Sequence, residues 1–283
     1  MKNYINKSYL ISYKGGSNTQ ISNRKNICVI LFGFLPRSFR FTYNRSIKKK
    51  YNVKVYSYSL KTKSNKLKAN RDEEKDIIIN LDHKKLIKFD IDVYEYQEDI
   101  QLDDIKCKTH YHALEHKNFI RSIYQEAQFI KNFKLEGFDS CVMLSNESLY
   151  INQINYEEIE YSINNNCCYT RSFLKYGGTA DGFYICKPDI LKKICCRYYD
   201  IIAKDRYCLY NYYQNSEGIL KNTFKLNNID DRNSTIYCLK VRANGKFSNE
   251  YTWYSDSYKF IKNIEKYVDK EEEKKIIEQF WHK

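Results

Sequence analysis

The feature that most constrains the fold is a continuous apolar segment near the start of the chain. It spans residues 27–35 and reads ICVILFGFL. A transmembrane helix needs ~20 apolar residues, about twice this length, and the polar stretch before the segment is not typical of a cleaved signal peptide. A short apolar run with Gly33 near its end and Pro36 just beyond predicts a strand, residues 26–34, that is buried on both faces. Such a strand belongs to a largely parallel sheet covered by helices on both sides, so the expected fold class is α/β.

Other patterns supply further strands and helices. Val53 and Val55 alternate with polar neighbours in a predicted strand at 52–60, and we expect further strands at 77–79, 87–96 and 138–144. Helices are predicted over 38–50, over 116–133, where apolar residues recur every three or four positions, and from just after Pro188-Asp189 to Ile202.

The end of the chain carries two further patterns. Asn244-Gly245 suits a type I′ turn and predicts a hairpin over 236–248, while 258–281 has the pattern of a charged amphipathic helix. The expected organisation is a flexible lead-in at 1–25, one domain at 26–250 and a C-terminal amphipathic helix at 251–283.

The net charge of +13 is unevenly placed. Residues 1–71 contain 17 basic and no acidic side chains, and the first carboxylate is Asp72; the remainder of the chain sums to −4. Lysine outnumbers arginine by 37 to 11, whereas nucleic-acid surfaces favour arginine for bidentate contacts. No arginine-rich stripe or RNP-type aromatic motif is present, so a nucleic-acid partner is not favoured, and the uneven charge points instead to phosphate binding in the N-terminal half.

Ten cysteines are scattered along the chain without C-x-x-C spacing. A disulfide framework is typical of much shorter secreted chains, so reduced thiols in a cytoplasmic compartment are expected.

One histidine-rich segment has metal-ligand spacing. Cys107, His110, His112 and His116 lie within ten residues, and 112–116 matches the H-x-x-E-H pattern of inverted zinc peptidases. The further Glu ligand expected downstream is missing between Glu160 and Glu217. Solvent-facing or capping histidines are therefore the favoured interpretation, and zinc peptidase is the weakest hypothesis.

Two other segments have the residue types of a phosphate or metal site. In 32–40 (FGFLPRSFR) a strand runs into a helix start, where free N–H groups together with Arg37 and Arg40 suit a phosphate; an ordinary strand–helix junction explains the spacing equally well. Glu147, just past a buried strand, suits a hard cation such as Mg²⁺ or Mn²⁺, and Asp181, in a glycine-rich turn, suits a second ligand or a proton acceptor. Taken singly, a surface loop residue and a turn former are the favoured interpretations of these two carboxylates.

The order of these pieces carries a resemblance. The series ICVILFGFLPRSFRFTYNRSI, NVKVYSYSL, NFIRSIYQEAQFI, FDSCVMLSNESLY, TADGFYICKPDIL and IYCLKVRANGK resembles a group of glycosyltransferase-like proteins found in giant viruses and in some bacteria and algae. The resemblance covers residues 26–248 and implies a GT-A-like (Rossmann-like), mostly parallel sheet flanked by helices, with nucleotide sugars as donors.

The resemblance also implies the donor-binding residues. The G-x-x-P-R turn of Gly33, Pro36 and Arg37 would lie against the donor nucleotide, and Arg121 and Tyr124 match positions that face the donor cleft.

The metal and acceptor positions follow in the same way. Ser145-Asn146-Glu147 stands where such proteins commonly carry R-P-D, the counterpart of a metal-binding D-x-D. Asn146 would then contact the donor, and Glu147 would hold a divalent metal, Mn²⁺ or Mg²⁺. Asp181 matches the acidic residue of an N-D-Q-F-like turn and would be the catalytic base. The segment 241–245 (VRANG) matches a late V-R-A-D-G hairpin.

These implications define the expected function. It is transfer of a sugar from a nucleotide-sugar donor to a hydroxyl of a glycan or protein acceptor, without a membrane span, in the cytoplasm (the host cytoplasm or a viral factory if the protein is viral). The alternatives are a catalytically inactive glycosyltransferase-like binding or structural protein, and a basic nucleic-acid-binding protein.

Overall fold

The computed structural model describes residues 24–34, 46–61, 89–96, 99–100, 113–150, 152–173, 175, 177–202 and 216–240. Several predictions from the sequence lie outside these ranges. They are the first part of the helix at 38–50, the strand at 77–79, the histidine-rich segment before residue 113, the hairpin turn after 240 and the C-terminal helix. The lead-in at 1–25 is outside as well, apart from its last two residues.

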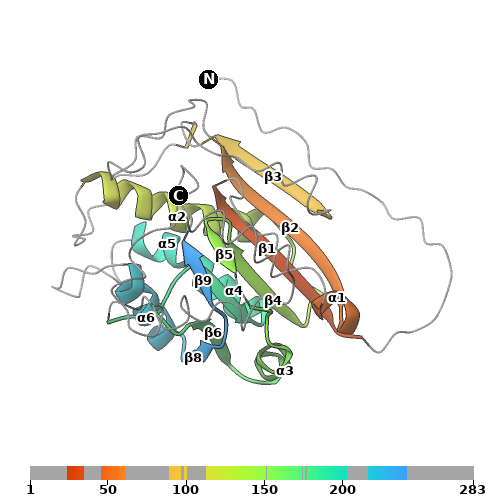
Figure 1. Cartoon of the computed structure of the whole chain (residues 1–283). Coiled ribbons are helices and arrows are strands. Elements are labelled where there is room, and N and C mark those ends of the chain that lie inside the picture. The colour runs from red at the N-terminus through yellow and green to blue at the C-terminus, as the bar shows by residue number, and fades with distance from the viewer. Residues whose placement is uncertain are drawn as a thin grey trace, which may run out of the picture.

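The described residues form an α/β fold around a seven-stranded, mostly parallel sheet (Figure 1). Its strands, in spatial order, are β3 (Ile91–Tyr96), β2 (Asn52–Lys61), β1 (Asn26–Phe34), β4 (Ser140–Ser145), β7 (Phe183–Cys186), β6 (Cys167–Arg171) and β8 (Asp230–Ser234). β7 is antiparallel to both β4 and β6, and every other neighbouring pair is parallel. A small second sheet pairs β5 (Ser148–Tyr150) with β9 (Cys238–Lys240).

The central strand β1 has the predicted bounds, and its predicted burial on both faces is confirmed. Successive side chains of a strand point to opposite faces. Ile27, Val29 and Leu31 accordingly belong to one buried cluster. Cys28, Ile30 and Phe32 belong to another on the opposite face.

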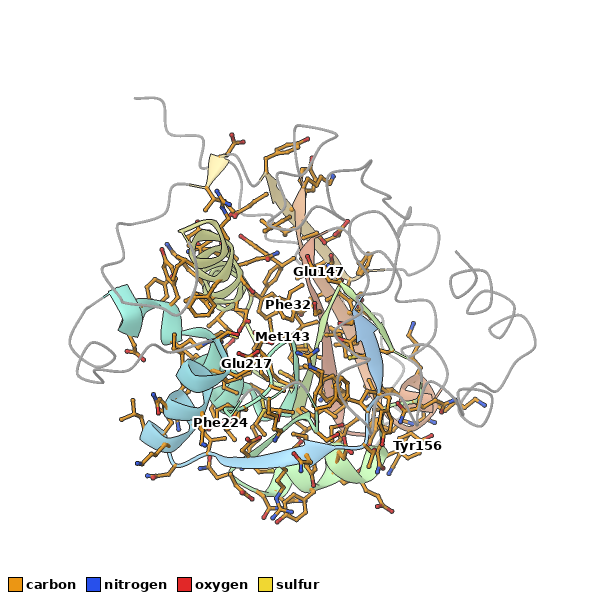
Figure 2. All side chains as sticks on the ribbon, turned by 60° about the vertical axis from the view of Figure 1, so that its left-hand side comes forward. Phe32, Met143, Glu147, Tyr156, Glu217 and Phe224 are labelled. Atoms are coloured by element: carbon orange, nitrogen blue, oxygen red, sulfur yellow. The ribbon has the colours of Figure 1, made fainter. Side chains whose placement is uncertain are left out.

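Helices cover both faces of the sheet. α2 (Ala113–Asn132), α4 (Pro188–Cys195) and α6 (Ser216–Leu226) contribute side chains to the cluster that contains Phe32, Met143 and Phe224 (Figure 2). α1 (Ser46–Lys50) and α3 (Tyr156–Asn164) contribute Ile47 and Ile159 to the opposite cluster. None of the helices in the described ranges is long and apolar enough to cross a membrane.

The strand predicted at 52–60 is confirmed as β2. Tyr56, Ser57, Tyr58 and Ser59 are all buried, because side chains of β2 pack into the clusters on both faces of the sheet.

The single helix predicted after Pro188-Asp189 is in fact two, α4 and α5 (Arg197–Ile202). At the break, the Arg197 guanidinium donates a hydrogen bond to the carbonyl of Ile194 (2.9 Å).

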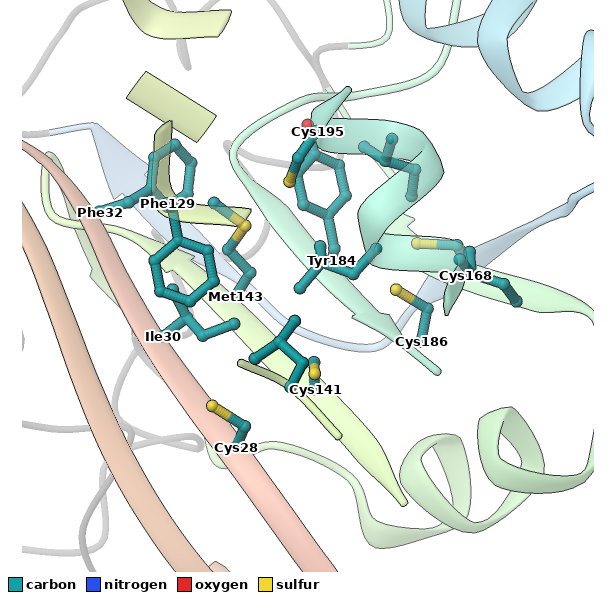
Figure 3. Close-up of a cluster of buried hydrophobic side chains, with 14 of the residues drawn as sticks. Cys28, Ile30, Phe32, Phe129, Cys141, Met143, Cys168, Tyr184, Cys186 and Cys195 are labelled. Atoms are coloured by element: carbon teal, nitrogen blue, oxygen red, sulfur yellow. The ribbon is translucent and has the colours of Figure 1, made fainter. Parts of the chain in front are cut away.

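Four cysteines form a row across the sheet (Figure 3). Cys28, Cys141, Cys186 and Cys168 are register partners on the adjacent strands β1, β4, β7 and β6. All four are free thiols and fully buried. Burial raises the pKa of Cys28 and of Cys186 well above the usual range, so these thiols stay neutral and pack as small apolar groups.

The cysteine row yields a stability prediction. Cys186→Ser places a hydroxyl in the apolar cluster and should lower the free energy of unfolding by about 1–3 kcal/mol. The same change at the half-exposed Cys196 should cost less than about 0.5 kcal/mol. Urea denaturation measures both, and equal losses would show that the row is not packed as described.

Candidate functional site

The strand order changes direction between β1 and β4. After β1 the chain adds β2 and then β3 on one side, and later β4 on the other. In open α/β sheets, ligands bind beyond the carboxyl ends of the strands at such a point. Gly33 lies near the carboxyl end of β1, and Asn146 and Glu147 directly follow β4. The topology therefore points to this end of the central strands as the candidate site. We call it the carboxyl edge of the sheet.

Backbone contacts bring these two strand ends together. The Asn146 N–H donates to the carbonyl of Phe32 (2.7 Å). Gly33 has φ +109°, a conformation that favours glycine, and a side chain there would point at Asn146. Figure 2 shows Phe32 and Glu147 toward the same end of the central strands.

The antiparallel strand β7 adds the second segment to this edge. Because β7 runs opposite to β4, its first residues, and not its last, lie beside the end of β4. The Ser145 N–H donates to the carbonyl of Gly182 (2.9 Å), and the hydroxyl of the buried Tyr150 lies within hydrogen-bond distance of the carbonyls of Ser145 (3.3 Å) and Gly182 (3.4 Å). Asp181 is therefore placed at the same edge as Asn146 and Glu147.

The helix α2 is fastened to this edge by the buried Gln125. Its side-chain amide donates to the carbonyls of Gly33 (3.2 Å) and Tyr58 (3.0 Å), at the ends of β1 and β2. Arg121 lies four residues earlier and therefore on the same helix face. Tyr124 instead packs its ring against Tyr198 of α5, with ring centroids 5.3 Å apart. The donor role expected for Arg121 and Tyr124 stays a prediction.

A small polar layer lies under the candidate site. The hydroxyls of Ser57 and Ser59 are 3.1 Å apart, and the Asn146 side-chain amide donates to Ser59 Oγ (3.4 Å). Asn146 is fully buried, and its Oδ1 makes no hydrogen bond to any residue that the structure describes. A buried carbonyl oxygen without a donor is suited to a ligand.

The residues present fit a hard divalent cation. Glu147 is half-buried, with its N–H bonded to Ser145 Oγ (3.3 Å), and it provides a carboxylate at the strand end. Within the described ranges, no three His, Cys, Asp or Glu side chains gather to hold a metal. Mg²⁺ is commonly held by one or two carboxylates together with substrate phosphates and water, so a single carboxylate here is compatible with it.

Asp181 is paired with Arg171, a residue that the sequence analysis did not single out. Arg171 ends β6, is 8% exposed, and its Nη2 lies 3.1 Å from Asp181 Oδ1. The same nitrogen also donates to the carbonyl of Asp181. β6 runs parallel to β4, so its last residue reaches the same edge. The only signal in the sequence was an arginine closing a short apolar stretch, which is too weak to identify the pair.

The loop before Asp181 is held from the neighbouring strand β8. The carboxylate of Asp231 accepts hydrogen bonds from the hydroxyls of Thr170 (2.8 Å) and Thr179 (2.7 Å). The Lys175 ammonium lies 3.5 Å from the same carboxylate. These contacts fix the position of Asp181 relative to the sheet.

The first turn of α6 packs on this loop and carries Glu217, for which the sequence has no local signal. The Thr179 N–H donates to the carbonyl of Glu217 (3.0 Å), and the Glu217 residue is 8% exposed. A side chain on Gly178 would lie 2.2 Å from the Glu217 carbonyl carbon and oxygen, so glycine is required for this approach.

A buried ion pair fixes α2 against α5. Arg197 donates to both carboxylate oxygens of Glu126 (2.6 and 3.1 Å), and both residues are 1% exposed. Burial raises the pKa of Glu126, and the Arg197 guanidinium opposes that shift by stabilising the ionised carboxylate. The pair holds the helix that carries Gln125 and Arg121.

Of the residues predicted from the sequence, the structure thus gathers Gly33, Asn146, Glu147 and Asp181 at one edge, with Arg121 on the helix face that meets it. Pro36 and Arg37 lie outside the described residues. The chain matches no protein-family model and no curated protein.

The Glu126–Arg197 pair generates one prediction. Arg197→Met alone leaves a buried carboxylate without its partner and should lower the free energy of unfolding by about 3–5 kcal/mol. The double variant Arg197→Met/Glu126→Leu removes both charges and should recover most of that loss. Denaturant unfolding compares the two, and a double variant that is no more stable than the single one would contradict this.

The close contact at Gly178 leads to a second stability prediction. Gly178→Ala should destabilise the protein by about 1–3 kcal/mol, because backbone must move to admit the methyl group. Gly137→Ala is the matched control, since Gly137 has a left-handed φ of +88° but open space around it. The loss of stability in Gly137→Ala, measured in the same denaturation series, reports backbone strain without a steric clash. A Gly178→Ala loss below that of the control would contradict the close approach.

Proposed function

We propose that this protein is a glycosyltransferase that moves a sugar from a nucleotide-sugar donor to a hydroxyl acceptor. The observation that carries the proposal is the hydrogen bond from Ser145 N–H to the Gly182 carbonyl. It places the segment with the proposed metal ligand, Glu147, beside the segment with the proposed base, Asp181, where the strand order changes direction. The GT-A-like resemblance of residues 26–248 predicts the same pairing of segments.

The proposed reaction needs two kinds of group at this edge. The acceptor oxygen attacks the anomeric carbon, the bond from that carbon to the phosphate oxygen breaks, and the nucleoside diphosphate leaves with the bonding electron pair. Positive charge must therefore face the pyrophosphate, and a base must take the acceptor proton.

The chain's own residues supply these groups. Arg121, and Arg37 by the resemblance, would provide fixed positive charge. Glu147 would hold a divalent cation, which supplies further charge neutralisation at the leaving group when bound. Asp181 Oδ1 contacts Arg171, so the oxygen assigned to the acceptor proton is Oδ2, which makes no hydrogen bond within the described part of the chain.

A second candidate is a nucleotide-sugar-binding protein without transferase activity. The Asp181–Arg171 pair favours it, because an arginine bonded to both the carboxylate and the carbonyl of Asp181 gives that residue a structural role. The two candidates share donor binding and differ in turnover.

One experiment tests both. UDP- and GDP-sugars with Mn²⁺ should raise the melting temperature, since a ligand at one hundred times its Kd adds about 2.7 kcal/mol of stability. Asp181→Asn should keep this donor-induced rise and lower the rate of nucleoside diphosphate release at least ~100-fold. Asp189→Asn, an exposed residue in the first turn of α4, is the matched control and should change neither.

The outcomes separate the candidates. No stabilisation by any nucleotide sugar would reject both. Stabilisation without turnover in the wild type would favour the binding protein.

A further inference from the structure

Glu217 is a buried carboxylate that has no role in the proposed transfer reaction. It belongs to the first turn of α6 and is 8% exposed. A buried carboxylate requires either a compensating positive charge or a proton. Its surroundings decide between these two.

The backbone places Glu217 against the Asp181 loop. The Thr179 N–H bonds to the Glu217 carbonyl, and Gly178 approaches the same peptide group closely enough to exclude any side chain. Thr179 is two residues before Asp181 and is itself held by Asp231 (2.7 Å). These contacts fix the backbone of Glu217 beside the loop that carries Asp181.

The charges that face Glu217 do not balance it. Arg171 lies 3.1 Å from Asp181 Oδ1 and is the positive group that acts on Glu217, while Asp181 is the negative one. One guanidinium thus stands against two carboxylates. Nearby lysines do not change this, because Lys221 of α6 is exposed and donates to the carbonyl of Gly177 (3.2 Å) and Lys175 lies 3.5 Å from Asp231. The charged side chains of the packing helix α4, Asp189, Lys192 and Lys193, are exposed.

A further buried polar group belongs to β7. The hydroxyl of the fully buried Tyr184, on β7, makes no hydrogen bond to any described residue. Both Asp181 and the Glu126–Arg197 pair act electrostatically on that hydroxyl.

We propose that Asp181 and Glu217 act as one carboxylate pair in which Asp181 is ionised against Arg171 and Glu217 holds the proton. Burial raises the pKa of Glu217 to about 7, and the negative charge of Asp181 adds to the shift. Hydrogen bonds from its own backbone N–H and from Ser216, together with the charge of Arg171, oppose the shift without cancelling it. Glu217 is then a positioning residue that keeps a second negative charge away from the proposed base and the donor pyrophosphate. This role in transfer rests on the proposed function, but the protonated state of Glu217 does not.

The pair has a defined effect on stability. The pKa of Glu217 is raised from 4.5, so the folded protein holds a proton that the unfolded chain has released between about pH 4.5 and pH 7. The contribution of Glu217 to stability is thus complete below pH 4.5 and is lost as the pH rises to 7.

The test is a pH titration of the full chain by infrared difference spectroscopy. Subtracting the spectrum of Glu217→Gln from that of the wild type isolates the carbonyl band of protonated Glu217. We expect this band to disappear with a midpoint near pH 7, and to disappear at a lower pH in Asp181→Asn, which removes the like charge. Glu157→Gln, an exposed residue in the first turn of α3, is the matched control and should leave the band unchanged.

Stability measurements supply a second readout. Because Gln mimics the protonated form, Glu217→Gln should gain stability relative to the wild type between pH 4.5 and pH 7. Should Glu217→Gln not fold, subtracting the wild-type spectrum at pH 9 from that at pH 6, in the wild type and in Asp181→Asn, gives the same comparison.

Two results would overturn the pair: a band midpoint near pH 4.5, or a midpoint that Asp181→Asn leaves in place. The proposed function fails separately. If the coupled titration is present but no nucleotide sugar with Mn²⁺ raises the melting temperature, the pair stands and the glycosyltransferase proposal does not.

Discussion

The pairing of β4 with the antiparallel strand β7 determines where the candidate site lies. The register sets Cys141 opposite Cys186 at one end and Leu144 opposite Phe183 at the other. A parallel strand in this position would bring its last residues to the carboxyl edge. Because β7 is reversed, the turn that precedes it arrives there instead, and with it Asp181. Gly33, Asn146 and Glu147 reach the same edge by ordinary parallel pairing.

The charges around Asp181 depend on that placement. Arg171 reaches the edge because β6 is parallel to β4, and Glu217 reaches it because α6 packs on the loop before β7. The buried Glu126–Arg197 pair and Gln125 hold α2 against the same end of the sheet. Residues of β1, β4, β6, α2, α6 and the turn before β7, far apart in the sequence, thus meet at one polar edge. The proposed binding of a donor at this edge would account for the polar groups that are buried there.

The sequence predicted those parts of the fold whose pattern is continuous. The position of β1 follows from the apolar run at residues 27–35, and α2 follows from its helical period. It did not predict the short elements, such as β6 and β8, because three to five residues carry too little periodicity to separate strand from loop. Asp181 was singled out because it stands in a glycine-rich turn, and Glu147 because it follows a buried strand; their roles stay predictions. Arg171 and Glu217 were not, since their importance arises from tertiary contacts that no local pattern encodes.

The central claim is that a donor and its metal bind at the carboxyl edge between β1 and β4. Paramagnetic broadening of amide signals by Mn²⁺ in the presence of a nucleotide sugar tests it most directly. Binding at this edge predicts broadening of the amide signals of Gly33, Asn146, Glu147 and Gly182. The signals of Asn26, Ser140 and Cys186, at the opposite ends of the strands, should be unaffected. Broadening confined to the opposite edge, or no broadening at residues of either strand end, would contradict it.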